Sequence, residues 1–149
     1  MKYKNPSPTV DALIYSKKSK KLLLIRRKNN PFKGFWALPG GFIDFGECVE
    51  DACKREALEE TSLNISKIFL FGVYSDPLRD PRGHSMSTVF LAPVEDFYGA
   101  CAKDDADDLK IFDFSELSGL EIAFDHSKII NDFLAFLKDP ETYIRKRLP

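Results

Sequence analysis

The sequence carries almost no net charge, because its 22 lysines and arginines face 23 aspartates and glutamates and leave a formal charge of −1. Proteins that bind nucleic acid or an anionic membrane surface need a clear excess of positive charge. Long apolar runs are also missing, and a stretch such as 68–73 falls far short of the roughly 20 residues that span a bilayer. We therefore expect no nucleic-acid partner and no membrane association.

The first ten residues, MKYKNPSPTV, contain no apolar segment of signal-peptide length. Cysteine is scarce as well, and the three residues Cys48, Cys53 and Cys101 cannot all pair within one chain. Cys48 and Cys53 lie five positions apart in a predicted helix, which points their side chains to different faces. Reduced thiols and a cytoplasmic location are therefore expected.

The chain does contain enough apolar material for one core, with 44% hydrophobic residues and 13 phenylalanines in 149 positions. A chain of this size builds one core more readily than two, so we predict a single domain over residues 1–149. β-rich runs alternate with amphipathic helical patterns, which indicates a mixed α/β fold that begins with a hairpin. The predicted strands cover 9–15, 21–27, 65–74, 87–94 and 110–114, the predicted helices cover 47–61 and 127–137, and an acidic loop covers 103–108.

Three glutamates of the first predicted helix, Glu56, Glu59 and Glu60, fall within an arc of roughly 100° on its surface. Like charges at this spacing repel, and near the C-terminal end of a helix each is disfavoured by up to about 1 kcal/mol. One interpretation is a solvated acidic face in which Arg55 pairs with Asp51 and Glu59. The other interpretation is that a bound cation neutralises the cluster.

The residues before this helix favour the second interpretation. An apolar stretch, 35–39, leads into Gly40 and Gly41, and glycine allows a backbone carbonyl to approach an ion without an intervening Cβ. Carboxylate oxygens are the ligands that Mg²⁺ prefers, usually together with water and substrate phosphates. The sequence therefore predicts a divalent-metal site between the glycine turn and the helix.

The spacing of these residues resembles the signature of a known family. The Nudix box, found in hydrolases that act on a nucleoside diphosphate linked to another group, is matched by Gly41, Glu47, Arg55, Glu56, Glu59, Glu60 and the following Thr61-Ser62-Leu63. The stretch 31–92 is similar to the ADP-ribose pyrophosphatase-like members of bacteria and archaea. Ser62 departs from the pattern, which usually has glycine there. A serine costs about 1 kcal/mol in a left-handed helix stop, or it moves the helix end toward Asn64.

The resemblance implies an α/β/α sandwich with a central mixed sheet and a loop-helix-loop catalytic motif. It implies Glu56 and Glu60 as metal ligands, Glu59 as a further ligand or water-orienting group, and the Gly41 carbonyl as an additional oxygen donor. The implied cofactor is Mg²⁺, with Mn²⁺ as the alternative. In such a site the metal activates a water that attacks phosphorus.

Two further roles in the implied reaction concern other residues. By resemblance, Arg55 is structural and holds Glu47 or a neighbouring acid in place. The general base is open, because family members take it either from the box or from an acid on a later loop. Each later acid taken alone is more typical of a solvated loop. These competing acids are Glu95, Asp96, Asp104, Asp105, Asp107 and Asp108.

Neither histidine is given a catalytic role from the sequence. His84 and His126 are isolated and lack the spacing of zinc ligands. Asp125 and His126 precede the last predicted helix, so we interpret them as its N-terminal cap region.

Substrate recognition must come from outside the box. Arg79 and Arg82 lie in the loop SDPLRDPRGH, and their guanidinium groups can make bidentate contacts with a phosphate or a terminal ribose. The remaining candidates are Arg26 or Arg27 at the end of the second strand, and Phe35 or Trp36 for stacking on adenine. The alternative interpretations are that the arginines are solvated loop residues and that the aromatic residues belong to the core.

The arginine loop and the segment 123–126 resemble the ADP-ribose-cleaving members. The implied reaction is the hydrolysis of ADP-ribose, a small-molecule nucleotide, to AMP and ribose 5-phosphate. An oxidised nucleoside triphosphate or a sugar nucleotide is the alternative substrate. A non-catalytic ADP-ribose sensor is the alternative of another class, although such regulators append a DNA-binding domain for which we expect neither room nor a basic surface. The sequence leaves the oligomeric state open, with a homodimer as one alternative.

Overall fold

The computed structural model describes residues 3–103 and 106–146, so two of the candidate bases, Asp104 and Asp105, lie outside the described residues. The strands are β1 (Ser7–Ser16), β2 (Lys21–Arg27), β3 (Trp36–Ala37), β4 (Gly40–Phe42), β5 (Phe69–Tyr74), β6 (Ser85–Pro93) and β7 (Ala106–Asp113). The helices are α1 (Val49–Thr61), the 3₁₀ helix η1 (Phe114–Gly119), α2 (His126–Lys138) and α3 (Pro140–Arg145).

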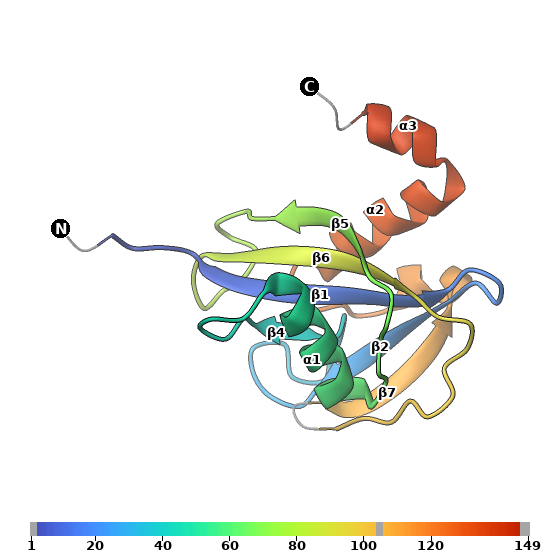
Figure 1. Cartoon of the computed structure of the whole chain (residues 1–149), viewed down its shortest axis with the longest axis horizontal. Coiled ribbons are helices and arrows are strands. Elements are labelled where there is room, and N and C mark those ends of the chain that lie inside the picture. Colours follow the sequence, from blue (N-terminus) through green and yellow to red (C-terminus); the bar gives the residue numbers. More distant parts are fainter. Residues whose placement is uncertain (1–2, 104–105, 147–149) are drawn as a thin grey trace.

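The strands of the described residues form one seven-stranded sheet (Figure 1). Its main path runs β3-β2-β1-β6-β5, while β4 also pairs with β1 and β7 pairs with β2. β1 runs parallel to β6 but antiparallel to β2 and β4, so the sheet is mixed as predicted. The predicted first hairpin is confirmed by the pairing of Tyr15 with Leu22 and of Ser16 with Lys21.

Alternation along the central strand β1 divides its side chains between two cores, one on each face of the sheet. Val10 and Ile14 belong to the core that contains the buried residues of α1. Leu13 and Tyr15 belong to the core that contains the buried residues of α2. Because each face is covered by a helix, the predicted α/β/α sandwich is confirmed (Figure 1).

Several element boundaries differ from the sequence-based prediction. The first helix begins at Val49 rather than Glu47, and Glu47 stays in the loop, where its carboxylate accepts a hydrogen bond from the Asp44 amide. β7 begins at Ala106, so Asp108 lies opposite Arg26 in the sheet rather than in an acidic loop. Pairing with a neighbouring strand overrides the polar local sequence there. β3, β4, η1 and α3 are too short for sequence periodicity to predict.

Ser62 ends α1 without moving the helix stop. The helix ends at Thr61, and Ser62 adopts the left-handed conformation itself, with a φ of 64°. Its amide donates to the Leu58 carbonyl, and its hydroxyl donates to the Cys101 carbonyl at 3.1 Å. The expected shift toward Asn64 is therefore wrong, because hydrogen bonds on both sides of the serine hold the strained conformation.

None of the three cysteines forms a disulfide within the described residues. All three thiols are free, with Cys48 and Cys101 exposed and Cys53 buried. Burial raises the pKa of Cys53 to about 12, so this thiol is protonated at neutral pH. In residues 3–103 and 106–146, no helix is both long enough and apolar enough to cross a membrane.

Candidate active site

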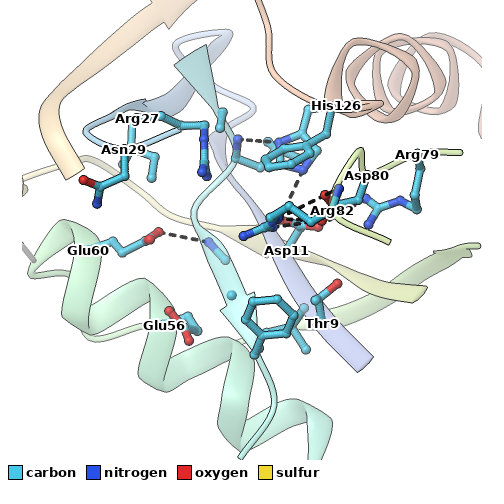
Figure 2. Close-up of a pocket in the computed structure, with 18 of the residues that line it drawn as sticks. Thr9, Asp11, Arg27, Asn29, Glu56, Glu60, Arg79, Asp80, Arg82 and His126 are labelled. Carbon is cyan, nitrogen blue, oxygen red and sulfur yellow. Dashed lines mark hydrogen bonds and ion pairs between the residues drawn. The ribbon is translucent and has the colours of Figure 1, made fainter. Parts of the chain in front are cut away.

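Gly41, Glu56 and Glu60 of the Nudix-like pattern line a cavity of about 360 Å³ between α1 and the central strand β1 (Figure 2). α1 supplies Glu56 and Glu60, and the segment from β3 to β4 supplies the glycine turn that faces them. β1, the loop after β2, the loop between β5 and β6 and the N-terminal end of α2 complete the wall. Three of the four predicted metal ligands, Gly41, Glu56 and Glu60, and three of the four predicted arginines are thus brought to one cavity, although 50 residues or more separate some of them in sequence.

Glu56 packs so closely against Gly41 that an added Cβ would displace its carboxylate, whereas at Gly40 the backbone of β1 leaves no room for a Cβ. A Cβ built on Gly41 would lie 2.5 Å from the Glu56 Oε1 atom, and one built on Gly40 would lie 2.1 Å from the Val10 carbonyl oxygen. Burial raises the pKa of Glu56, and the negative charges of Glu59 and Asp44 add to this effect, although Arg55 opposes it. The Glu56 carboxylate therefore lies where additional positive charge would stabilise its ionised form.

Glu60 is buried, with 7% of its surface exposed, at the same wall of the cavity. Its Oε2 atom accepts a hydrogen bond from the Gly40 amide at 3.0 Å. Glu60 and Glu56 are four residues apart, so one turn of α1 places both carboxylates beside the glycine turn (Figure 2). Glu59 points elsewhere: its side chain is 44% exposed and does not line the cavity.

Arg55 explains how α1 tolerates its acidic face. Its guanidinium contacts Glu47 at 2.7 and 2.9 Å, Glu56 at 2.9 Å and Glu59 at 3.2 Å. It also donates to the Phe42 carbonyl at 3.1 Å, which ties α1 to β4. The hydrogen bond to Arg55 lowers the pKa of Glu47 to about 2, and the same pair raises the pKa of Arg55. This geometry agrees with the predicted structural role of Arg55.

The carboxylates of the cavity are suitable ligands for a divalent cation, but they are not gathered around one point. Within the described residues, no three histidine, cysteine, aspartate or glutamate side chains are gathered into a group that could hold an ion. The reason is that Arg55 draws Glu56 and Glu59 toward its guanidinium, while Gly40 holds Glu60. Hard carboxylate oxygens beside a turn without Cβ atoms are the donor set that Mg²⁺ and Mn²⁺ accept. The residues therefore fit such an ion once Glu56 turns from Arg55.

Two arginines face the carboxylates from across the cavity. Arg82 is half-exposed and pairs with the buried Asp80 at 2.8 Å, and its guanidinium lies 5.4 and 5.5 Å from the rings of Phe42 and Phe124. The guanidinium of Arg27 also lies near Phe124, at 4.8 Å from the centre of its ring, and Nε of Arg27 donates to the Pro31 carbonyl. Burial alone would raise the pKa of Asp80, but the hydrogen bonds from Arg82 lower it. The cavity thus has an acidic wall and a basic wall.

Arg79 is neither a solvated loop residue nor a flexible ligand for phosphate. Its side chain is 4% exposed and makes two hydrogen bonds to Asp125, at 3.0 and 2.7 Å. A third bond, at 2.9 Å, goes to the Ser85 hydroxyl. Asp125 is the N-cap residue of α2, so the predicted cap region is confirmed, but its carboxylate holds Arg79 and makes no capping hydrogen bond to the helix.

The other predicted substrate residues lie outside the lining of this cavity. Arg26 points to the opposite face of the sheet from Arg27, because side chains alternate along β2 and Arg27 is in phase with Ile25, which also lines the cavity. Its guanidinium lies 5.9 Å from the Trp36 ring and 4.0 Å from the Asp108 carboxylate. Trp36 packs edge-to-face on Phe112 in the core beneath α2. Phe35 packs on Phe32 in the core beneath α1. Adenine stacking on Trp36 or Phe35 therefore has no support from this geometry.

The cavity contains polar residues that sequence reasoning missed. None of the candidate bases among the described residues, Glu95, Asp96 and Asp108, lines it, and for Asp107 only the backbone is described. Asp11, Asp80 and His126 do line it. Asp11 was detectable as the one carboxylate in the apolar strand TVDALIYS. His126 is unsuited to be the base, because Nδ1 accepts the Leu38 amide proton and Nε2 faces Asp11 at 3.4 Å.

A second cavity, of about 710 Å³, adjoins the first and shares Arg79 and Phe124 with it. Its lining is mostly aromatic and aliphatic, and it opens beside Leu78, whose surface is 90% exposed. The remaining lining residues are Phe32, Val73, Tyr74, Ser75, Asp76, Pro81, Asp125 and Lys128.

Comparisons with known proteins agree with the geometry of the site. The model of the NUDIX domain matches residues 5–133. An ADP-ribose pyrophosphatase of Methanocaldococcus jannaschii is 50% identical over 134 residues, which cover 89% of this chain and 75% of that protein.

Two solved structures superpose well on this chain. The NUDIX domain of Shewanella oneidensis NrtR complexed with ADP ribose superposes with a TM-score of 0.78 at 31% identity, covering 99% of this chain and 91% of that chain. A bifunctional NMN adenylyltransferase/ADP ribose pyrophosphatase from Francisella tularensis, complexed with AMP and a Mn ion, gives a TM-score of 0.79 at 31% identity. The match covers 91% of this chain but only 43% of that one, so the chain spans less than half of the bifunctional protein.

Proposed function

The chain belongs to the Nudix family of pyrophosphohydrolases, and from the two walls of its cavity we propose that it hydrolyses ADP-ribose to AMP and ribose 5-phosphate with the help of Mg²⁺. The observation that carries this proposal is the opposition of charges across one cavity: Glu56 and Glu60 on α1 face Arg27 and Arg82. A substrate with a diphosphate needs both, because its oxygens bind a cation on one side and guanidinium groups on the other.

Glu56 and Glu60 would hold the cation, with Glu59 and the Gly41 carbonyl as further oxygen donors. Mn²⁺ is the alternative to Mg²⁺. When bound, such an ion neutralises the diphosphate and lowers the pKa of a coordinated water. Arg55 keeps the acids of α1 in place through Glu47, so its contribution is structural. Asp44, which also lines the cavity and is exposed, joins the box glutamates as a candidate for the general base.

The two cavities together account for a substrate with two arms. The first cavity, with its arginines, suits the phosphates, and the second cavity, whose lining includes Phe32, Tyr74 and Phe124 beside polar residues, suits the adenosine arm. Ribose 5-phosphate would then extend past Arg82 toward solvent. The name of the Methanocaldococcus relative and the ADP ribose bound by the Shewanella domain support this substrate over an oxidised nucleoside triphosphate or a sugar nucleotide.

The second candidate function is an ADP-ribose sensor. It is favoured by one observation, the similarity to the NrtR domain that was solved with ADP ribose. The retained carboxylates of α1 favour an enzyme, because binding alone does not require them. A cytoplasmic location and a homodimer remain predictions from the sequence.

A substrate panel tests the proposal. The pure protein is incubated with Mg²⁺ and, separately, ADP-ribose, a sugar nucleotide, a dinucleoside polyphosphate, an oxidised nucleoside triphosphate and a canonical one. We expect the highest kcat/KM for ADP-ribose and no turnover of any substrate in excess EDTA. A higher kcat/KM for a triphosphate would refute the substrate. Tight binding of ADP-ribose without turnover at saturating Mg²⁺ would favour the sensor.

A further inference from the structure

The segment that leads into the glycine turn is held by hydrogen bonds to three other elements. The Gly40 amide donates to Glu60 of α1. The Leu38 amide donates to Nδ1 of His126 at 3.0 Å, and the Ala12 amide donates to the Pro39 carbonyl at 2.8 Å. The segment 38–40 therefore has a hydrogen bond at every residue, and each bond goes to a different element of the fold.

His126 can hold the Leu38 amide only in one tautomer. Because Nδ1 accepts a proton from an amide, the ring proton must lie on Nε2, which faces Asp11 Oδ1 at 3.4 Å (Figure 2). The ring is 4% exposed, so water does not compete for either nitrogen. The carboxylate of Asp11 thus fixes which nitrogen is available to the backbone.

Asp11 is itself fixed by groups that do not touch the cavity's carboxylates. It is 6% exposed and accepts a short hydrogen bond from the Ser87 hydroxyl on β6. The Arg79 guanidinium, held by Asp125, lies 3.8 Å from the same Asp11 oxygen, Oδ2, which leaves Oδ1 to face His126. A Cβ on Gly40 would lie 2.5 Å from Asp11 Oδ1, so the turn passes directly over this carboxylate.

We propose that Asp11 and His126 are positioning residues for the metal site. The pair sets the Leu38 amide, Leu38 sets the direction of the segment that follows, and Gly40 then presents its amide to Glu60. This inference rests on the proposed function only in assigning Glu60 to the cation. It adds that a residue of α2, 66 positions beyond Glu60, adjusts the affinity for the metal.

Two substitutions of His126 separate this role from simple packing. In His126→Asn the side-chain Oδ1 atom occupies the place of Nδ1 and still accepts the Leu38 amide proton. In His126→Gln the longer side chain reaches Asp11 but offers Leu38 no acceptor at that place. If the ring matters only by filling space, the larger glutamine should be tolerated better than asparagine. If it positions the turn, the order is reversed.

The first readout is binding of Mn²⁺ to the protein alone, measured by titration without substrate. Loss of a group that orients a metal ligand typically costs about 10- to 100-fold in affinity. We expect about a tenfold weaker binding or more for His126→Gln and less than a threefold change for His126→Asn and for the exposed control His84→Asn. Equal affinities in all variants, or asparagine weaker than glutamine, would overturn the proposal.

The second readout needs only the wild-type protein, so it holds even if His126→Gln does not fold. We expect amide hydrogen exchange at Leu38 to slow when Mn²⁺ is added, because the ion fixes Glu60 and thereby Gly40 and the turn. An unchanged exchange rate at Leu38 while Mn²⁺ is bound would contradict the coupling. Failure of ADP-ribose turnover would refute the proposed function and leave both readouts unaffected.

Discussion

Glu56→Gln should separate stability from activity in this protein. The substitution keeps the size of the side chain and removes one charge from α1. Glu59 and Glu60 lie three and four residues away, and each like-charge pair at these spacings costs about 0.2–0.5 kcal/mol. The loss of the Arg55–Glu56 ion pair, at 2.9 Å and partly exposed, costs about 0.2–1 kcal/mol in return. These effects offset, so the free energy of unfolding without metal should change by less than about 1 kcal/mol.

The pH dependence of this comparison has a defined sign. Burial raises the pKa of Glu56 in the folded state, so the ionised form is disfavoured there. At acid pH the wild-type side chain is protonated and resembles glutamine, so the charge at position 56 should make no difference to the stability of the two proteins. As the pH rises through the raised pKa, the wild type loses stability relative to Glu56→Gln. Urea unfolding in EDTA between pH 4 and pH 8, in roughly even steps, measures this difference.

Activity should respond very differently to the same substitution. A metal ion contributes several kcal/mol to transition-state stabilisation, and each 1.36 kcal/mol is tenfold in rate, so kcat should fall by at least about 100-fold. Glu50→Gln is the matched control, because Glu50 is an exposed acid in the first turn of the same helix. It should leave kcat unchanged. Near wild-type turnover by Glu56→Gln at saturating Mg²⁺ would refute the metal site, and a loss of stability of several kcal/mol would refute the charge argument.

Three further predictions concern the two loop arginines, the ion pair between Glu47 and Arg55, and the C-terminal end of α1. Arg82→Ala should raise the KM for ADP-ribose by about 10- to 150-fold, which corresponds to the loss of one charged hydrogen bond of about 1.5–3 kcal/mol. Arg79→Ala should instead lower the free energy of unfolding by about 3–5 kcal/mol, because the Asp125 carboxylate loses its partner. Equal effects of the two in steady-state kinetics and thermal unfolding would contradict this division. Glu47→Gln should remove a stabilising contribution that is present above pH 4.5 and lost as the pH falls through about 2, so acid unfolding curves of the two proteins should converge. Ser62→Gly should raise Tm by about 2–4 °C by removing about 1 kcal/mol of left-handed strain, and a lower Tm would show that the lost hydroxyl bond matters more.

The box was predictable because its information is local. Residues 55–60 lie on one helix, so their spacing alone gives the direction of each side chain, and the expected pairing of Arg55 with Glu59 is present. The other expected partner, Asp51, does not appear among the ion pairs of the described residues. The pairing of Arg55 with Glu47 was implied by the family resemblance and not by local spacing. The strands were predicted for the same reason, since alternation and β-rich composition are local patterns.

The rest of the site depends on contacts between distant segments. The sequence offered Arg26 and Arg27 as alternatives; alternation puts them on opposite faces of β2, but only the folded chain shows that the cavity lies on the face of Arg27. Arg79 resembled a ligand for phosphate until its carboxylate partner, 46 residues later, was placed beside it. His126 gave no signal by itself, because its role depends on Asp11, which lies more than 100 residues earlier in the chain.

The most direct test of the account is the position of oxygen from solvent in the products of ADP-ribose cleavage. The reaction is run in ¹⁸O-labelled water with Mg²⁺, and the products are analysed by mass spectrometry. A water activated beside Glu56 and Glu60 attacks phosphorus, so AMP and ribose 5-phosphate should form with the label on a phosphate oxygen of one product. Label on the anomeric carbon of a ribose, or products other than these two, would contradict the proposed reaction at this cavity.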